Sequence, residues 1–242
     1  MTEVRPRAGD IVAQVHEQLR NAILLGEIRP GVKTSQAELA RDLGVGRTPL
    51  REAVRMLQDE GLVLAEPNRR VQIASLSVQD AEELYVMRIA LEVAASRITT
   101  PQLTRGDIAE LEGLMAQMSH LASADSVALF RPVHRAFHER FVAGAGTRPA
   151  ALIAELFDHA ERYRAVYGAA SSPDHFGRRT AEHRAMLDAA AAGDADAVAV
   201  AVAVHYVKTA RLVSDALDPD HPLDRLRTTV AAVASGAVSA FD

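Results

Sequence analysis

Apolar residues recur at helical spacing along most of this 242-residue chain, and the pattern is interrupted by a single convincing pair of short strands. The two strand segments are Leu62–Glu66 and Val71–Ala74, and residues 67–70 connect them. One small hairpin in a helical chain is typical of the wing of a winged helix-turn-helix. The sequence therefore predicts a mainly α protein whose β structure is confined to the N-terminal third.

Three helices are expected before the hairpin, and a glycine closes each of them. Ser35 followed by Glu38 has the spacing of a capping box, which marks the start of the second helix. The expected helices are Ile11–Leu25, Gln36–Leu43 and Arg47–Glu60. Residues 1–75 are therefore predicted to form a winged helix-turn-helix DNA-binding domain.

The rest of the chain is expected to be all helical, with prolines and glycines at the breaks. The six expected helices are Val78–Ile98, Thr104–Leu121, Asp125–Val142, Ala150–Tyr167, Asp174–Ala192 and Asp194–Ala216. They predict an antiparallel helical bundle of six to seven helices over residues 76–216. Residues 217–242 fit either a weak final helix or a loose tail.

Charge and composition set limits on the function. Residues 1–75 carry 11 Lys/Arg and 10 Asp/Glu, whereas the remaining residues carry 16 and 22, so the N-terminal part is the more electropositive one. The chain has no cysteine, which excludes disulfides and thiolate metal sites. An apolar leader and a long uncharged apolar stretch are both absent from the sequence, so a cytoplasmic protein without a membrane span is expected.

The third expected helix carries the strongest functional pattern. Arg47, Arg51 and Arg55 are four residues apart and share one face, opposite an apolar stripe of Leu50, Ala53, Val54 and Leu57. Arginine can bond two acceptors on guanine or bind a phosphate, and Thr48 can add a contact near the helix start. The alternative is a solvated face whose arginines pair with Glu52, Asp59 and Glu60. At the hairpin tip, Asn68, Arg69 and Arg70 are further candidates for DNA contact.

Residues 14–77 resemble the winged domain of the GntR family. The similarity lies in IRPG (28–31), in ELARDLGVGRTPLREAVRMLQDEGLV (38–63) and in the wing PNRR (67–70). The resemblance implies that Arg47, Arg51 and Arg55 contact an operator, and that two copies bind a palindromic site. Three positions depart from the usual pattern: Gly46, where members commonly have Ser or Thr, Arg70 in place of a wing glycine, and Ala37 in place of an arginine found in some members.

Four of the nine histidines lie at positions that can converge in the bundle. His134 and His138 are spaced i, i+4 on a face rich in phenylalanine, so both rings point inward. His183 lies ten residues before Gly193 and His205 twelve after it, which places them at nearly equal depth in a helical hairpin. Neutral imidazoles suit transition metals, and the alternative is a set of core histidines without a metal.

Residues 78–213 resemble the FCD-type ligand-binding domain of the FadR subfamily, through YVMRIALEVAASR (85–97), FH (137–138), EHRAMLDAAAAGDADA (182–197) and His205. The resemblance implies that His138, His183 and His205 are metal ligands, and the position of His134 is usually Asp or Asn. A fourth nitrogen favours zinc or nickel over manganese or magnesium. Arg88 lies on an apolar stripe and implies one of two roles: a structural ion pair, expected with a glutamate on another helix, or, with Arg162 and Tyr163, a site for an acidic effector.

The leading hypothesis is a metabolite-responsive DNA-binding regulator and repressor. It is expected to act as a homodimer on double-stranded operator DNA, with a divalent metal and a small organic acid as ligands. One alternative keeps the DNA-binding fold but has a metal-free pocket for a larger apolar effector. The other is a metal-dependent hydrolase, which is disfavoured because Arg135 stands where a helical zinc protease has its general base. The protein is therefore not expected to be an enzyme.

Overall fold

The computed structural model describes residues 8–66, 70–123, 127–168 and 173–241. The chain divides into two compact units, residues 1–76 and residues 77–242, each with its own set of packed elements. We call them the N-terminal unit and the helical unit, and each is described by itself.

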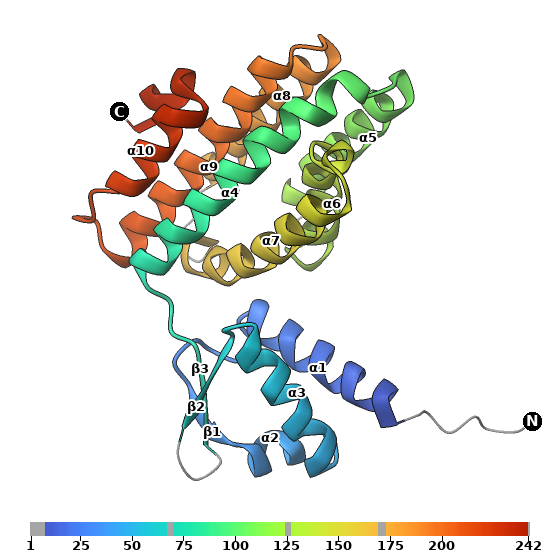
Figure 1. Cartoon of the computed structure of the whole chain (residues 1–242), viewed down its shortest axis with the longest axis vertical. Helices are drawn as coiled ribbons and strands as arrows, with labels where there is room; N and C mark the ends of the chain where they lie inside the picture. The colour runs from blue at the N-terminus through green and yellow to red at the C-terminus, as the bar shows by residue number, and fades with distance from the viewer. Residues whose placement is uncertain (1–7, 67–69, 124–126, 169–172, 242) are drawn as a thin grey trace, which may run out of the picture. The chain divides into compact units, whose positions relative to one another are not determined.

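The N-terminal unit contains the three predicted helices and the predicted hairpin, together with one additional strand (Figure 1). Its elements are α1 (Ala8–Leu24), β1 (Lys33–Ser35), α2 (Gln36–Asp42), α3 (Arg47–Asp59), β2 (Val63–Glu66) and β3 (Arg70–Ile73). The strand order is β1-β3-β2, and both neighbouring pairs are antiparallel. The sequence did not predict β1, because Lys33, Thr34 and Ser35 are polar and show no alternation that would mark a strand.

Local chemistry explains where α2 begins and how α3 is oriented. The backbone N–H of Glu38 donates to Oγ of Ser35, and the backbone N–H of Ser35 donates to the carboxylate of Glu38, so the predicted capping box is confirmed. The apolar stripe of α3 packs into a core with α1 and the sheet. Since Leu50 and Leu57 on that stripe are fully buried, the opposite face of α3 is turned to solvent.

The helical unit contains all six predicted helices, with ends within a few residues of the predicted ones, and a seventh helix. The elements are α4 (Val78–Thr99), η2 (Thr100–Gln102), α5 (Arg105–Ser123), α6 (Val127–Arg140), η3 (Ala143–Ala145), α7 (Thr147–Gly168), α8 (Pro173–Ala191), α9 (Ala195–Leu217), α10 (Asp224–Val233) and η4 (Ser235–Phe241). Helices α4 and α9 lie side by side, and α7, α10 and η3 also pack against α4 (Figure 1). The predicted fold class is confirmed.

The C-terminal segment, which the sequence left open, forms α10 and η4. Leu223, the residue before α10, has a left-handed φ of 53° and provides no side-chain cap. Instead Glu82 of α4 accepts hydrogen bonds from the backbone N–H groups of Arg225 and Leu226, at 2.8 and 3.1 Å. His221 lies 2.9 Å from the same carboxylate. A cap supplied from α4 satisfies the first turn of α10 and attaches the segment to the bundle.

Helix α9 has the length and apolar composition of a membrane span, and it is the one such helix in the described ranges. In its most apolar window, 61% of the helix is buried inside the bundle. Packing against α4 and α8 accounts for its apolar character as that of a core helix.

Candidate functional site

The arginine face of α3 is exposed, as the periodicity predicted. Arg47, Thr48, Arg51 and Arg55 all lie on the solvent side. Arg51 contacts its neighbour Glu52 at 3.4 Å, and an exposed ion pair of this kind contributes little to stability. Glu60 is engaged elsewhere, since it accepts from His16 and Arg20 of α1 at 2.5 and 2.8 Å. Arg47 and Arg55 have no ion-pair partner among the described residues, so two of the three arginines on this face are not neutralised by acidic neighbours.

The start of α3 explains how a glycine is tolerated there. Gly46 is the N-cap residue and offers no side-chain oxygen. The third residue of the helix is Pro49, which has no N–H to be capped. A serine or threonine at position 46 would therefore find only the N–H of Thr48 as a capping partner. Glycine in place of the usual GntR residue thus removes at most one capping hydrogen bond from α3.

The wing residues are placed only in part. Asn68 and Arg69 lie outside the described residues. Arg70 was predicted in the connection, but the structure places it in β3, paired with Ser35 of β1 and Glu66 of β2. Its strand position follows from the three-strand sheet, which the sequence did not reveal. Its side chain is exposed.

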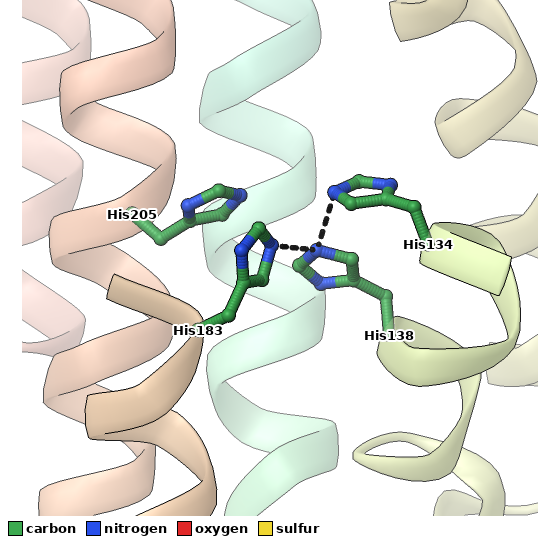
Figure 2. A group of neighbouring side chains, drawn as sticks. All are labelled: His134, His138, His183 and His205. Carbon is green, nitrogen blue, oxygen red and sulfur yellow. Dashed lines mark hydrogen bonds between the residues drawn. The ribbon is translucent and has the colours of Figure 1, made fainter. Parts of the chain in front are cut away.

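The four predicted histidines come together inside the helical unit (Figure 2). His134 and His138 are on α6, His183 is on α8 and His205 is on α9, and each side chain is only 2–3% exposed. Nε2 of His138 lies 3.1 Å from Nε2 of His134 and 3.2 Å from Nε2 of His183. One ligand nitrogen from each of the four rings falls within 4.8 Å of the others. Nitrogens bound to one tetrahedral zinc ion are about 3.4 Å apart, so the spacing suits a single ion.

His205 is oriented by a carboxylate. Its Nδ1 lies 2.9 Å from Oε2 of Glu182, whose other oxygen is 3.4 Å from Nζ of Lys208. A carboxylate at Nδ1 favours the tautomer with the proton on Nδ1, which leaves the lone pair on Nε2. A carboxylate that holds the outer nitrogen of an imidazole is the usual arrangement around metal-binding histidines.

His138 is oriented by Tyr206, the residue next to His205. The phenolic oxygen lies 3.2 Å from Nδ1 of His138 and donates to Glu92 at 2.5 Å. Burial and the charge of Glu92 raise the pKa of Tyr206, although the charge of Arg88 opposes this, so the phenol keeps its single proton. Because that proton is directed to Glu92, Nδ1 of His138 must be the donor to the phenolic oxygen. The lone pair of His138 is then on Nε2.

This tautomer leaves the Nε2 lone pair of His138 directed at the centre of the cluster. A neutral imidazole with its proton on Nδ1 has one lone pair on Nε2, and that lone pair accepts one good hydrogen bond. Nε2 of His138 faces two other Nε2 atoms at hydrogen-bond distance, so hydrogen bonding alone does not serve both contacts well. A cation at the centre would interact with the Nε2 lone pairs of His138 and His205 together. The donor set therefore fits a metal ion.

Arg88 takes part in the same network. Its Nε donates to Glu92 at 2.8 Å and a terminal nitrogen donates to Tyr206 at 2.8 Å. Burial opposes its charge, but the negative charge of Glu92 outweighs burial and holds the pKa of Arg88 above its ordinary value. The structural ion pair considered for Arg88 is present, with a partner one turn along α4. The suggestion that the partner lies on another helix was wrong, because Glu92 has the i, i+4 spacing on α4 itself.

The other two predicted effector residues lie on α7. Arg162 and Tyr163 are both buried. The hydroxyl of Tyr163 donates to the carboxylate of Asp80 and lies 3.3 Å from the carbonyl of Ser77. Asp80 is eight residues before Arg88, about 12 Å along α4, so this hydroxyl is directed to the start of α4.

A cavity of about 220 Å³ lies beside His138. Its polar lining consists of Glu92, His138 and Glu139, and its apolar lining of Val142, Ala143, Ala150, Ile153, Ala154 and Phe157. The sequence did not predict Glu92, Tyr206 or Glu182 as supporting residues. The i, i+4 spacing of Arg88 and Glu92 was the available signal, whereas Tyr206 reaches His138 from another helix.

The comparisons with known proteins match both units. Residues 11–73 match the family of bacterial regulatory proteins described as the gntR family, and residues 83–208 match the FCD domain. The HTH-type transcriptional regulator YdhC of Bacillus subtilis is 30% identical over 132 residues, which are 53% of this chain and 58% of that protein. The HTH-type transcriptional repressor GlaR of Escherichia coli is 30% identical over 158 residues, 62% of this chain and 70% of that protein.

The solved structure of E. coli McbR/YncC has the same fold, with a TM-score of 0.74 and 20% identity over 85% of this chain and 97% of that one. The sequence matches to YdhC and to a regulator of Agrobacterium vitis, at 58% and 53% of those proteins, span little more than half of their lengths. The two family matches fall within the N-terminal unit and the helical unit, so sequence and fold support the same assignment. The chain belongs to the GntR family of bacterial transcriptional regulators and carries an FCD domain.

Proposed function

We propose that the protein is a metabolite-responsive repressor that binds one transition-metal ion and one small carboxylate in its helical unit. Residues 1–75 would bind operator DNA, residues 76–216 would bind the ligands and form the homodimer, and residues 217–242 would complete the bundle as an extra helix. The observation that carries the proposal is the convergence of four buried histidines. Two of them, His138 and His205, are held in place by hydrogen bonds at Nδ1.

The metal ligands would be His134, His138, His183 and His205. Four imidazole nitrogens favour zinc or nickel over magnesium or manganese, which prefer oxygen. The bound ion would supply a Lewis-acidic centre for an anionic ligand. Glu182 and Tyr206 hold the rings of His205 and His138 with their lone pairs on Nε2, so the chain presents these two ligands in the required tautomer.

The effector would occupy the cavity beside His138. A cavity of about 220 Å³ is smaller than the ~300–1,000 Å³ pockets that hold drug-sized ligands, which supports a small acid over a larger apolar effector. Arg88 would offset the negative charge of Glu92 in the cavity wall, through the ion pair that the two residues form. Arg162 and Tyr163 are the less favoured effector contacts, since the Tyr163 hydroxyl is already bound to Asp80.

A hydrolytic enzyme is less well supported. A hydrolase needs a carboxylate or another base next to the metal-bound water. Glu182 is bound to His205 and Lys208, and Glu139 is paired with Arg135 at 2.7 Å. Neither acidic neighbour of the histidines is therefore directed into the cluster as a base, and the protein is proposed not to be an enzyme.

DNA binding would use the exposed face of α3, with Arg47, Thr48, Arg51 and Arg55 toward the major groove. Arg70 and the wing residues Asn68 and Arg69 would contact the backbone or an adjacent groove. Two copies would bind the two halves of a palindromic operator in the cytoplasm, and the effector would change operator affinity by favouring one arrangement of the dimer.

Metal analysis of protein purified without a histidine tag tests the metal half of the proposal. We expect close to one zinc or nickel ion per chain, and loss of that ion in the His138→Ala/His183→Ala variant. His120→Ala, on the exposed surface of α5, is the matched control and should keep the metal. Folded, metal-free wild-type protein would contradict the metal site and favour the metal-free alternative.

An electrophoretic mobility shift with the protein's own promoter region tests the DNA half. We expect a sequence-selective shift that weakens as salt rises and changes when small organic acids are added. The absence of a selective shift would contradict operator binding, whatever the metal analysis shows.

A further inference from the structure

The outward face of α4 has no charged residue between Glu83 and Arg97, over more than three helical turns. Met87 and Ile98 are 47% and 53% exposed, and Ala90 and Ala94 between them are also exposed. These residues are three or four apart, so they form one stripe along the helix. We call it the α4 stripe. The charged residues of α4 between Glu83 and Arg97, which are Arg88 and Glu92, are buried on the other side.

An exposed apolar stripe of this kind is unusual on a helix whose other faces are already packed. Tyr85, Ile89 and Val93 are fully buried, and Ala95 packs in a cluster with Val142 and Ile153. Helix α4 therefore carries apolar residues on its outward face as well as on its packed faces, which is the pattern of a helix covered on every side. Contiguous exposed apolar surface marks a binding face for another protein.

We propose that the α4 stripe is the homodimer interface, in which α4 packs against α4 of a second copy in antiparallel orientation around a two-fold axis at Ala90. The inference rests on the proposed homodimer and names its surface. Ala90 would lie next to the partner's Ala90, where small side chains allow close approach. Met87, three residues before the axis, would pack against the partner's Ala94, four residues after it. A large side chain would thus meet a small one on both sides.

Charge supports a second copy as the occupant. Glu83 is seven residues before Ala90 and pairs with Arg225 at 3.0 Å. Arg97 is seven residues after Ala90 and pairs with Asp196 at 2.8 Å. A two-fold axis at Ala90 therefore brings Glu83 near the partner's Arg97, and Arg225 near the partner's Asp196. A parallel arrangement would place like charges together, so the charge pattern is self-complementary only in the antiparallel one.

The complete lack of cysteine in the chain allows a direct test. A single cysteine at a two-fold axis forms a disulfide with its own copy, because the two Cα atoms come within about 4.4–6.8 Å. We would oxidise full-length Ala90→Cys, Ala94→Cys and Ala231→Cys variants at micromolar concentration and follow the covalent dimer on non-reducing gels. Ala231 is an exposed alanine on α10 and gives a matched control.

We expect Ala90→Cys to cross-link at least tenfold faster than the other two variants. Ala90→Glu should raise the dimer dissociation constant at least tenfold in light scattering, because two carboxylates would meet at the axis, whereas Ala231→Glu should leave it unchanged. Melting temperatures of both variants check that they remain folded. A dimer in which Ala231→Cys or Ala94→Cys reacts fastest, or which Ala90→Glu leaves intact, would overturn the α4 interface alone. A monomeric wild type would overturn the homodimer as well.

Discussion

Tyr206 holds His138 through a contact of 3.2 Å between the phenolic oxygen and Nδ1. The two residues are 68 positions apart and belong to α9 and α6. The contact fixes which nitrogen of His138 carries the proton, and so makes Tyr206 part of the proposed metal centre although it is not a ligand. The same phenol also links the cluster to Glu92 and Arg88.

Replacing Tyr206 with phenylalanine should weaken metal binding without removing a ligand. Loss of a residue that orients a metal-binding histidine typically costs about 10–100-fold in metal affinity, and we expect Tyr206→Phe to fall in that range. The measurement is competition for zinc with a chromophoric chelator. Tyr163→Phe, which removes a buried hydroxyl bound to Asp80, is the control and should bind zinc like the wild type. Equal affinity of Tyr206→Phe and wild type would refute the positioning role.

His134 should determine which metals the site prefers. His134→Asp replaces a nitrogen donor with an oxygen donor, and so should lower the preference for zinc and nickel relative to manganese. We expect the ratio of zinc to manganese affinity, measured by calorimetry, to fall at least tenfold. His120→Asp, on the exposed face of α5, should leave the ratio unchanged. An unchanged ratio in His134→Asp would mean that His134 is not a ligand.

The arginine face of α3 should contribute most of the operator affinity. Arg47→Ala, Arg51→Ala and Arg55→Ala should each cost about 1–3 kcal/mol of binding free energy if the side chain contacts a base, or reduce the salt dependence by about one ion if it contacts a phosphate. Fluorescence anisotropy over a range of salt concentrations separates the two cases. Arg184→Ala, an exposed arginine of α8, is the control. An operator affinity unaffected by all three changes would mean that another surface binds DNA.

Glu82 should make the stability of the helical unit depend on acid. Burial tends to raise its pKa, but hydrogen bonds from His221 and from the backbone N–H groups of Leu226 and Arg225 outweigh burial, so the pKa of Glu82 is lowered from its ordinary 4.5. A lowered pKa in the folded state contributes stability that is complete above about pH 4.5 and is lost as the pH falls through the folded value.

Glu82→Gln should therefore lower the free energy of unfolding at pH 7 by about 1–3 kcal/mol, and the difference from wild type should shrink below pH 4.5. Urea denaturation at several pH values gives both quantities. Glu112→Gln, at an exposed position on α5, is the control and should have little effect. A wild-type to Glu82→Gln difference that is the same at pH 7 and at pH 3.5 would contradict this role of the carboxylate.

Most of the fold could be predicted from the sequence because helical periodicity and glycine or proline breaks are local signals. Strand β1 was missed because it is held by backbone pairing with β3, to which its polar residues give no clue. The state of α10 was left open because its cap, Glu82, comes from a helix about 140 residues earlier. In both cases the stabilising partner is distant in the chain.

The histidine cluster could be predicted because its geometry follows from helix rules. The i, i+4 spacing brings His134 to His138, and a nearly equal distance from Gly193 brings His183 to His205. The residues that orient the rings were not predicted, since Tyr206 and Glu182 act across helix pairs whose contact the sequence does not define. The cavity beside His138 is equally a product of packing between helices.

Operator affinity measured with and without small organic acids, for wild-type protein and for His138→Ala/His183→Ala, tests the central claim most directly. Fluorescence anisotropy with a duplex from the protein's own promoter region gives both affinities at fixed salt. We expect at least one acid to change the affinity of metal-loaded wild type at least fivefold, and the folded double variant to bind DNA without that response. A double variant that responds like the wild type would contradict the histidine centre as the effector site.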